Sequence, residues 1–217
     1  AVRGVLKAAW QLGQMSAEDY YKAASVKGVK NDTLPAGREL TQGEITALMS
    51  ACEHDTTNAG ARDAAIVGLM YSCGLRREEV VTLDLADYES ESGRLVVRGK
   101  GNKERIAWLT GGAARAVADW LAVRGEDTGA LFVAVNKSGR MASQKNMTPK
   151  TIYNMLAKRA TEAGVKSFSP HDMRRTFVSD LLDAGADITT VSKMAGHSSV
   201  TTTSRYDRRP EEAKRKA

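Results

Sequence analysis

The stretch that decides the fold and the chemistry of this chain is residues 169–206, SPHDMRRTFVSDLLDAGADITTVSKMAGHSSVTTTSRY. It holds two of the three histidines of the chain, His171 and His197, together with Arg174 and Tyr206. Arginine guanidinium groups match phosphate oxygens in two-point geometry, and imidazole groups move protons near neutral pH. A tyrosine hydroxyl can act as a covalent nucleophile when a base takes its proton. This combination favours chemistry on a phosphodiester.

The first part of the stretch predicts a helix that starts at Pro170. Ser169 is a favourable N-cap, and proline is favoured at the first helical position. His171 and Arg174 are three residues apart, so they share one face of that helix. They therefore lie in the first turn, where free backbone N–H groups favour an anion.

The second part predicts a shorter helix that begins at Asp187 and ends at Gly196, since aspartate caps helix starts and glycine ends helices. His197 follows in a loop that can hold its side chain towards a site. Tyr206 comes nine residues later, after a run rich in Thr and Ser that can begin another helical turn. Each motif alone is common on solvated helix surfaces, but the ordered set is far more specific than its parts.

Two upstream motifs complete the set: GLRREE at 74–79 and GKGNKER at 99–105. Together the five motifs resemble the catalytic domain of the tyrosine recombinases, the family of phage integrases and Xer-type recombinases. That family's signature is an arginine, a lysine in a β-turn, His-x-x-Arg, His or Trp, and a tyrosine. Here these positions are GLRREE, GKGNKER, HDMRR, AGHSS and SRY, and the resemblance runs from about Thr41 to Arg209.

The resemblance implies a role for each signature residue. Tyr206 is the nucleophile that becomes linked to a DNA 3′ phosphate, and His171 accepts its proton. Arg76 and Arg174 bind the phosphate oxygens, and His197 donates a further hydrogen bond. Lys100 protonates the departing 5′ oxygen.

Two of these assignments require a choice between neighbours. The family's arginine directly follows Gly-Leu, which selects Arg76 over Arg77. The family's lysine opens the turn after a glycine, which selects Lys100 over Lys103. The resemblance further implies that Glu79 supports Arg76.

The remaining candidates for DNA phosphate contacts are Arg77, Lys103, Arg105, Arg175 and Arg205. No metal ion, ATP or other cofactor is required, because a phosphotyrosine preserves the energy of the broken bond.

Composition sets outer bounds on the interpretation. With 217 residues the chain can bury one good core, and a net charge of +6 fits a polyanionic partner. The two cysteines, Cys52 and Cys73, form no ligand or disulfide pattern, which favours a reducing compartment. No apolar run reaches the roughly 18 residues of a membrane span, and no secretory signal is visible.

The predicted fold class is α+β and mainly helical, with a small three-stranded antiparallel sheet. LADY (85–88), RLVVRGK (94–100) and ERIAWL (104–109) are short, rich in β-forming residues and separated by turn sequences, with Lys100 in the second turn. LFVAV (131–135) is strand-like, and KSGRMASQKN (137–146) is expected to be a loop. Helices are expected at 112–125 and from Pro149 onwards.

Three segments are expected along the chain. Residues 1–28 predict two helices, and the resemblance implies that they are the last helices of a truncated core-DNA-binding domain. The start at Ala1 without a methionine leads us to expect a trimmed fragment. Residues 29–40 are polar, with Gly, Asn, Asp and Pro, and predict a linker. Residues 41–217 are expected to be the catalytic domain with a short tail, opening with a capping box at Thr41 and Glu44.

The function implied is site-specific recombination or integration, in which DNA strands are cleaved and rejoined through a 3′-phosphotyrosyl intermediate. The alternatives are a type IB topoisomerase or telomere resolvase with the same chemistry, and a DNA-binding protein that uses the fold without cutting. A helix-turn-helix regulator also fits residues 172–196, but it explains neither Tyr206 nor Arg76.

The expected partners follow from the resemblance. They are double-stranded DNA, a homo-tetramer assembled on paired DNA sites from subunits that are monomeric when free, and accessory DNA-bending proteins. The expected location is the cytoplasm, at the bacterial nucleoid, or the host cytoplasm for a phage-encoded mobile element, without membrane association.

Overall fold

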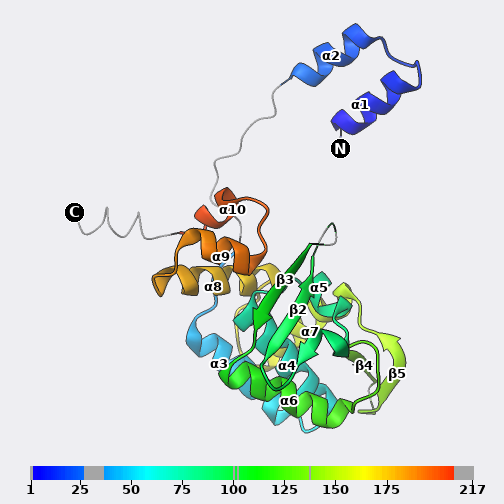
Figure 1. Ribbon diagram of the computed structural model, residues 1–217. Helices are drawn as coiled ribbons and strands as arrows, with labels where there is room; N and C mark the ends of the chain where they lie inside the picture. The colour runs from blue at the N-terminus through cyan, green and yellow to red at the C-terminus, as the bar shows by residue number, and fades with distance from the viewer. Residues whose placement is uncertain (1, 27–36, 100, 102, 137, 208–217) are drawn as a thin grey trace, which may run out of the picture. The chain divides into compact units, whose positions relative to one another are not determined.

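The computed structural model describes residues 2–26, 37–99, 101, 103–136 and 138–207 (Figure 1). The chain divides into two compact units, Ala1–Pro35 and Ala36–Ala217. The first unit contains α1 (Val2–Gln11) and α2 (Ala17–Ser25). Ser16 caps the second helix, because its hydroxyl accepts a hydrogen bond from the Asp19 backbone N–H at 3.0 Å. The predicted linker falls largely on residues 27–36, which lie outside the described residues.

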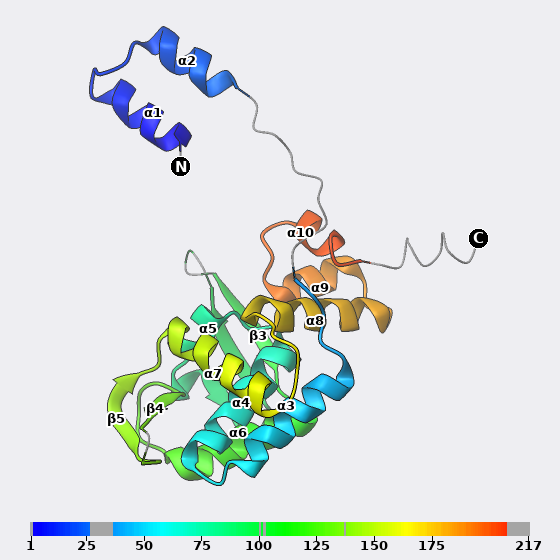
Figure 2. The same cartoon turned by 180° about the vertical axis from the view of Figure 1, so that it is seen from behind.

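The second unit is mainly helical, as predicted, with a small three-stranded antiparallel sheet. Its helices are α3 (Gln42–His54), α4 (Asn58–Cys73), α5 (Arg77–Thr82), α6 (Gly111–Arg124), α7 (Pro149–Glu162), α8 (Pro170–Asp183), α9 (Ile188–Ala195) and α10 (Val200–Ser204). Its strands are β1 (Tyr88–Glu89), β2 (Arg94–Arg98), β3 (Glu104–Trp108), β4 (Val133–Val135) and β5 (Met141–Asn146). The sheet β1–β3 lies on one side of α4, and α3 and α7 lie on the other side (Figures 1 and 2).

The centre of the core is α4, which packs against α3, α6 and α8. Ala65, Ile66 and Leu69 on this helix are fully buried. Trp120 of α6 is also fully buried, and its indole N–H donates to the Leu131 carbonyl at 2.9 Å. The helix α4 ends at Gly74 in a left-handed conformation, which places the loop residues Leu75 and Arg76 directly after this rigid element.

The predicted helix starts are confirmed at three places. Thr41 and Glu44 form a reciprocal capping box at the start of α3. Ser169 is the N-cap of α8, with Pro170 at the first helical position. Asp187 caps α9, which ends at Gly196 with φ +62°.

The three-stranded sheet has the predicted meander order, β1-β2-β3, but its first strand is shorter than predicted. Leu85–Asp87 is a 3₁₀ turn, and only Tyr88–Glu89 pairs with β2. The reason is local capping: the Asp84 carboxylate accepts from the Ala86 N–H, and the Asp87 carboxylate accepts from the Asp84 N–H. These bonds favour a turn over an extended strand.

The prediction of a loop over 137–146 is wrong in its second half, where Met141–Asn146 forms β5 and pairs antiparallel with β4. The turn between them is held by the Asn136 side-chain oxygen, which accepts from the N–H groups of Ser138 and Arg140. The sequence MASQKN lacks β-branched residues and alternation, so backbone pairing with β4 and not local propensity decides the strand. No helix in the described part of the chain combines the length and the apolar character needed to cross a bilayer.

Candidate active site

A cavity of about 330 Å³ is lined by residues from the start of α5, from α7 and from the start of α8. Its walls include three of the predicted catalytic residues, Arg76, His171 and Arg174. The other lining residues are Arg77, Glu78, Tyr153, Ser169 and Pro170. Residues about 100 positions apart in the sequence therefore meet because α8 packs across α4.

Tyr206 and His171 are in direct contact: the Nε2 atom of His171 and the hydroxyl oxygen of Tyr206 are 3.0 Å apart. The tyrosine follows α10 and is 9% exposed. Burial lowers the pKa of His171, and the positive charges of Arg174 and Arg175 lower it further. A histidine with a lowered pKa is neutral at physiological pH, so it can accept a proton from the phenol.

His197 is held in place by α10, the short helix that precedes Tyr206. Its ring lies nearly parallel to the ring of Tyr206, with centroids 6.1 Å apart, and its Nδ1 atom is 2.8 Å from the Thr203 hydroxyl oxygen. Burial and the charges of Arg174 and Arg76 lower the pKa of His197 to about 4. When the Thr203 hydroxyl donates to Nδ1, the ring proton of neutral His197 lies on Nε2, which is then a hydrogen-bond donor.

Arg174 is 2% exposed and is held by backbone carbonyls from two different elements. Its Nη1 atom donates to the carbonyl of Gly74 at 2.6 Å, and its Nη2 atom donates to the carbonyl of Ala195. Burial and the charge of Arg76 lower the pKa of Arg174 to about 9, so it remains charged at neutral pH. The side chain is therefore preorganised by α4 and α9 before any anion binds.

Arg76 is fixed by Glu79, which is 4% exposed. The carboxylate of Glu79 accepts from Arg76 Nη1 at 2.6 Å and from the Arg76 backbone N–H at 3.0 Å. Arg76 Nη2 also donates to the Gly196 carbonyl at 3.4 Å. Glu79 is therefore a buried support for the arginine, in contrast to an ordinary exposed helix residue.

The candidate phosphate contacts lie in different surroundings. Arg175 is buried, and its guanidinium carbon lies 5.3 Å from the centroid of the Tyr206 ring. Arg105 is largely buried and donates to Glu79 at 3.0 Å. Arg77 pairs with Glu78 on the rim of the cavity at 2.8 Å. Lys103 and Arg205 are exposed.

Lys100 lies outside the described residues. In the sequence it falls between β2 and β3. The Gly99 N–H, which comes before it, donates a hydrogen bond to the Lys103 carbonyl, which comes after it, at 2.8 Å.

Two residues of the site are not among those that the sequence predicts as functional. Thr203, which is fully buried, bonds to His197 and also accepts the Tyr206 backbone N–H at 2.9 Å. Gly74 supplies a carbonyl to Arg174. In the sequence, a glycine at this place indicates only that a helix ends there in a left-handed conformation. Among the described residues, no three His, Cys, Asp or Glu side chains are grouped so as to hold a metal ion.

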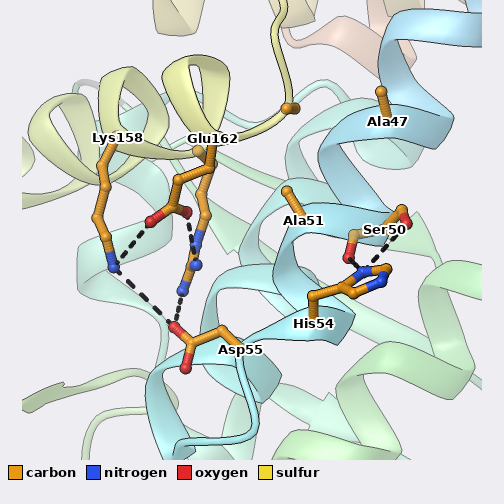
Figure 3. A pocket seen from close by; sticks show the side chains of 9 residues that line it. Ala47, Ser50, Ala51, His54, Asp55, Lys158 and Glu162 are labelled. Carbon is orange, nitrogen blue, oxygen red and sulfur yellow. Dashed lines mark hydrogen bonds and ion pairs between the residues drawn. The ribbon is translucent and has the colours of Figure 1, made fainter.

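A larger cavity, of about 750 Å³, lies between α3 and α7 (Figure 3). Ala47, Ala51 and His54 line one side, and an ion-pair network of Asp55, Lys158, Arg159 and Glu162 lines the other. The Nδ1 atom of His54 lies 2.7 Å from the backbone carbonyl oxygen of Ser50 in the same helix. None of the predicted catalytic residues that the structure describes lines this cavity, so size does not identify the chemical site.

The smaller cavity therefore brings a base, His171, together with the fixed cations Arg76 and Arg174, and the Tyr206 hydroxyl contacts that base. The guanidinium groups of Arg76 and Arg105 share one carboxylate, Glu79, and the charge of Arg76 also acts on Arg174, so the site holds an excess of positive charge that suits a bound anion. This arrangement can stabilise a phosphate that is attacked by Tyr206.

Comparison with known families gives a match over residues 38–212 to the phage integrase family. Tyrosine recombinase XerC of Corynebacterium efficiens is 35% identical over 199 residues, which cover 89% of this chain and 60% of the relative. Tyrosine recombinase XerA of Pyrococcus furiosus is 33% identical over 177 residues, which cover 81% of this chain and 58% of the relative. The chain thus spans about three fifths of the length of these curated relatives.

Solved structures share the fold. A crystal structure of XerA recombinase matches with a TM-score of 0.68 at 24% identity, covering 95% of this chain and 76% of the other. A structure of XerH site-specific recombinase bound to its palindromic difH substrate, a post-cleavage complex, also matches with a TM-score of 0.68, covering 87% of this chain and 56% of the other.

Proposed function

The chain belongs to the phage integrase family, and from this premise we propose that it is the catalytic part of a site-specific DNA recombinase. It cleaves and rejoins DNA strands through a 3′-phosphotyrosyl intermediate, without metal or ATP. The observation that carries this proposal is the contact between the Tyr206 hydroxyl and His171 Nε2 at 3.0 Å, beside two fixed arginines.

In the first step the Tyr206 oxygen attacks the scissile phosphorus while its proton passes to His171. A phenol with an ordinary pKa of about 10 needs such a base at neutral pH. The new bond joins the tyrosine oxygen to the 3′ phosphate, and the bond to the 5′ oxygen breaks. The lowered pKa of His171 supports this role, because the ring is neutral before the reaction.

The charge that develops on the phosphate is stabilised by Arg76, Arg174 and His197. Preorganised donors are most effective where charge appears in the transition state. This role is supported by the hydrogen bonds that hold the three donors in place before a phosphate binds. Arg76 bonds to Glu79, Arg174 bonds to the carbonyls of Gly74 and Ala195, and His197 bonds to Thr203.

The proton for the departing 5′ oxygen comes from Lys100, in keeping with the family signature. The reverse reaction, in which a 5′ hydroxyl attacks the phosphotyrosine, restores a DNA phosphodiester. Because bond energy is kept in the protein–DNA linkage, the same groups serve cleavage and rejoining.

Double-stranded DNA is the proposed substrate, and a homo-tetramer on paired sites is the proposed active assembly. XerH has been solved on its difH substrate and a lambda integrase dimer on a COC′ core site, which supports DNA as the partner. Native gels of the protein with one DNA site and with linked DNA sites would show whether subunits assemble on pairs.

The test of the reaction class is covalent capture. The protein is incubated with a randomised pool of nicked duplexes, the reaction is stopped in detergent, and DNA that stays attached to protein is recovered and sequenced. We expect an enriched family of sequences from the wild-type protein and none from Tyr206→Phe, which loses only the hydroxyl. The Phe variant should still bind the enriched duplex. Failure of the wild-type protein to trap any duplex, or trapping by Tyr206→Phe, contradicts the proposal.

A type IB topoisomerase uses the same linkage but relaxes supercoils as a monomer. Relaxation of a plasmid that lacks the enriched sequence, at protein concentrations that give no pairing, would favour that alternative.

A further inference from the structure

We infer that Arg105 is a positioning residue of the catalytic site, which holds Glu79 and the Gly196–His197 turn in the places that Arg76 and His197 need. This inference rests on the proposed function. The sequence offers Arg105 only as a candidate phosphate contact at the end of the GKGNKER motif, where solvent exposure would be expected.

The first observation is the direction of β3. Arg105 pairs with Val97 in the register, and both side chains lie on the inner face of the sheet, where Val97 is 1% exposed. The apolar neighbours Ile106 and Trp108 face outwards and are 44% and 58% exposed. Successive side chains of a strand point to opposite faces, so a register shift of one residue would turn Arg105 outwards and Ile106 and Trp108 inwards. The fold thus places an arginine inside and a tryptophan outside.

The second observation is the contact that Arg105 makes inside. Its Nη2 atom donates at 3.0 Å to Glu79 Oε2, the oxygen that also accepts the Arg76 backbone N–H. The other oxygen, Oε1, accepts from Arg76 Nη1. Both arginines therefore fix the same buried carboxylate, one from the residue that precedes α5 and one from β3.

The third observation concerns the turn that carries His197. A Cβ atom built on Gly196 would lie 3.0 Å from Arg105 Nε and 3.1 Å from its Cδ, so the arginine packs directly against this glycine. The Gly196 carbonyl accepts from Arg76 Nη2. Arg105 thus connects the hairpin β2–β3, the support of Arg76 and the turn before His197.

The fourth observation is that this placement is unfavourable by itself. The Arg105 side chain is 12% exposed, and its Nε and Nη1 atoms are buried without a hydrogen-bond acceptor among the described residues. Burial lowers its pKa. An incompletely paired buried cation destabilises a fold, so a position chosen for stability alone would hold an apolar residue. Such exceptions are expected where a side chain serves function.

The test measures single-turnover cleavage of the duplex obtained by covalent capture, together with its dissociation constant and the salt dependence of binding. Arg105→Met should lower the cleavage rate at saturating DNA by about tenfold to a hundredfold, as for other groups that orient a functional residue. The dissociation constant and the slope of binding against salt should stay unchanged. Arg105→Lys, which keeps the charge and one bond, should show a smaller loss.

A double-mutant cycle tests the route through Glu79. Glu79→Gln and Arg105→Met should together lose little more than the larger single loss, because both act through one contact. The matched control is Arg98→Met on the same hairpin: Arg98 also pairs with a buried carboxylate, Asp87 at 2.5 Å, but its side chain is 46% exposed. Its cleavage rate should stay within about twofold of wild type, as for surface changes away from a site.

Three results would overturn the inference. A salt slope that falls by about one unit with weaker binding would make Arg105 a direct phosphate contact. Cleavage by Arg105→Met at the wild-type rate would remove any role, and multiplicative losses in the cycle would exclude the route through Glu79. If the melting temperature of Arg105→Met lies well below that of the wild type, the cleavage rate of Arg105→Lys decides whether Arg105 has this role. A wild-type protein that forms no adduct would instead contradict the proposed function itself, and the inference with it.

Discussion

At the scale of single residues, Arg174 shows how the fold prepares a catalytic group. Its guanidinium bridges the carbonyls of Gly74 and Ala195, so its plane is set by two helix ends. A lysine in its place keeps a charge but lacks the planar fork. We therefore expect Arg174→Lys to lower single-turnover cleavage by about 10²–10³, the loss typical of a transition-state donor.

The same substitution leaves one buried carbonyl without its donor, which destabilises the fold by about 1–3 kcal/mol. Urea unfolding measures this second effect. The matched control is Arg115→Lys on the exposed face of α6, which should alter neither quantity. Cleavage by Arg174→Lys at close to the wild-type rate would place the phosphate elsewhere.

His171 gives a prediction about pH. The ring must be neutral to accept the Tyr206 proton, so the rate falls as pH drops through the pKa of His171. Burial and the neighbouring arginines hold that pKa below its ordinary 6.5. The acid limb of single-turnover cleavage should therefore have its midpoint below pH 6.5, and the rate should rise to a plateau towards neutral pH.

Circular dichroism at each pH provides the control, because protonation of buried histidines also destabilises the fold. His197 has its pKa lowered from 6.5 to about 4 in the folded state, so the unfolded state binds the proton first and stability falls progressively as pH drops from 6.5 towards 4. An acid limb with a midpoint above pH 6.5 in folded protein would exclude His171 as the base.

At the scale of elements, the end of α4 is the joint on which the site depends. Gly74 has φ +59°, and a Cβ atom there would lie 2.3 Å from the Phe177 ring on α8. We expect Gly74→Ala to destabilise the protein by roughly 2–5 kcal/mol, the sum of left-handed strain and overpacking. Cleavage should fall as well, because the Gly74 carbonyl holds Arg174.

Gly164, which follows α7, separates the two contributions. Its φ is +64°, but nothing lies within 4 Å of a built Cβ atom. Gly164→Ala should therefore show only the strain of about 1–2 kcal/mol. Urea unfolding of both variants measures the difference, and equal losses would show that the contact with Phe177 relaxes freely.

At the scale of the whole molecule, α3, α4 and α7 are joined by ion pairs around the buried Arg159, and Figure 3 shows the part of this network that includes Asp55, Lys158 and Glu162. Arg159 is 1% exposed and bonds to Asp63, Asp55 and Glu162. Removing one member of such a network leaves buried charges unpaired. Arg159→Met should therefore destabilise the protein by about 3–5 kcal/mol, while cleavage per folded molecule stays unchanged.

Lys158→Met is the matched control, because Lys158 contacts the same carboxylates from an exposed position and should contribute at most about 1 kcal/mol. The pH dependence adds a check. Burial alone would raise the pKa of Asp55, but hydrogen bonds from Thr57 and Arg159 lower it to about 2. Its contribution to stability is present above pH 3.8 and is lost as pH falls towards 2, and Arg159→Met should reduce that loss. Equal stability of Arg159→Met and Lys158→Met would contradict this account of the network.

The sequence by itself determined the features that arise within a few residues. The capping box at Thr41, the start of α8 at Ser169 and the end of α9 at Gly196 were all predicted, because these signals are hydrogen bonds and backbone preferences of near neighbours. The order of the signature motifs also identified the family that the comparison found. The assignment of Lys100 stays a prediction.

Only the tertiary structure decided which residues meet. The strand β5, the bond between His197 and Thr203, and the carbonyl partners of Arg174 all depend on how separate elements pack. The inward position of Arg105 even opposes the apolar pattern of its own strand, since the register with β2 and the buried Glu79 outweigh the exposure of Trp108. Such pairings join residues far apart in the chain, and no local preference encodes them.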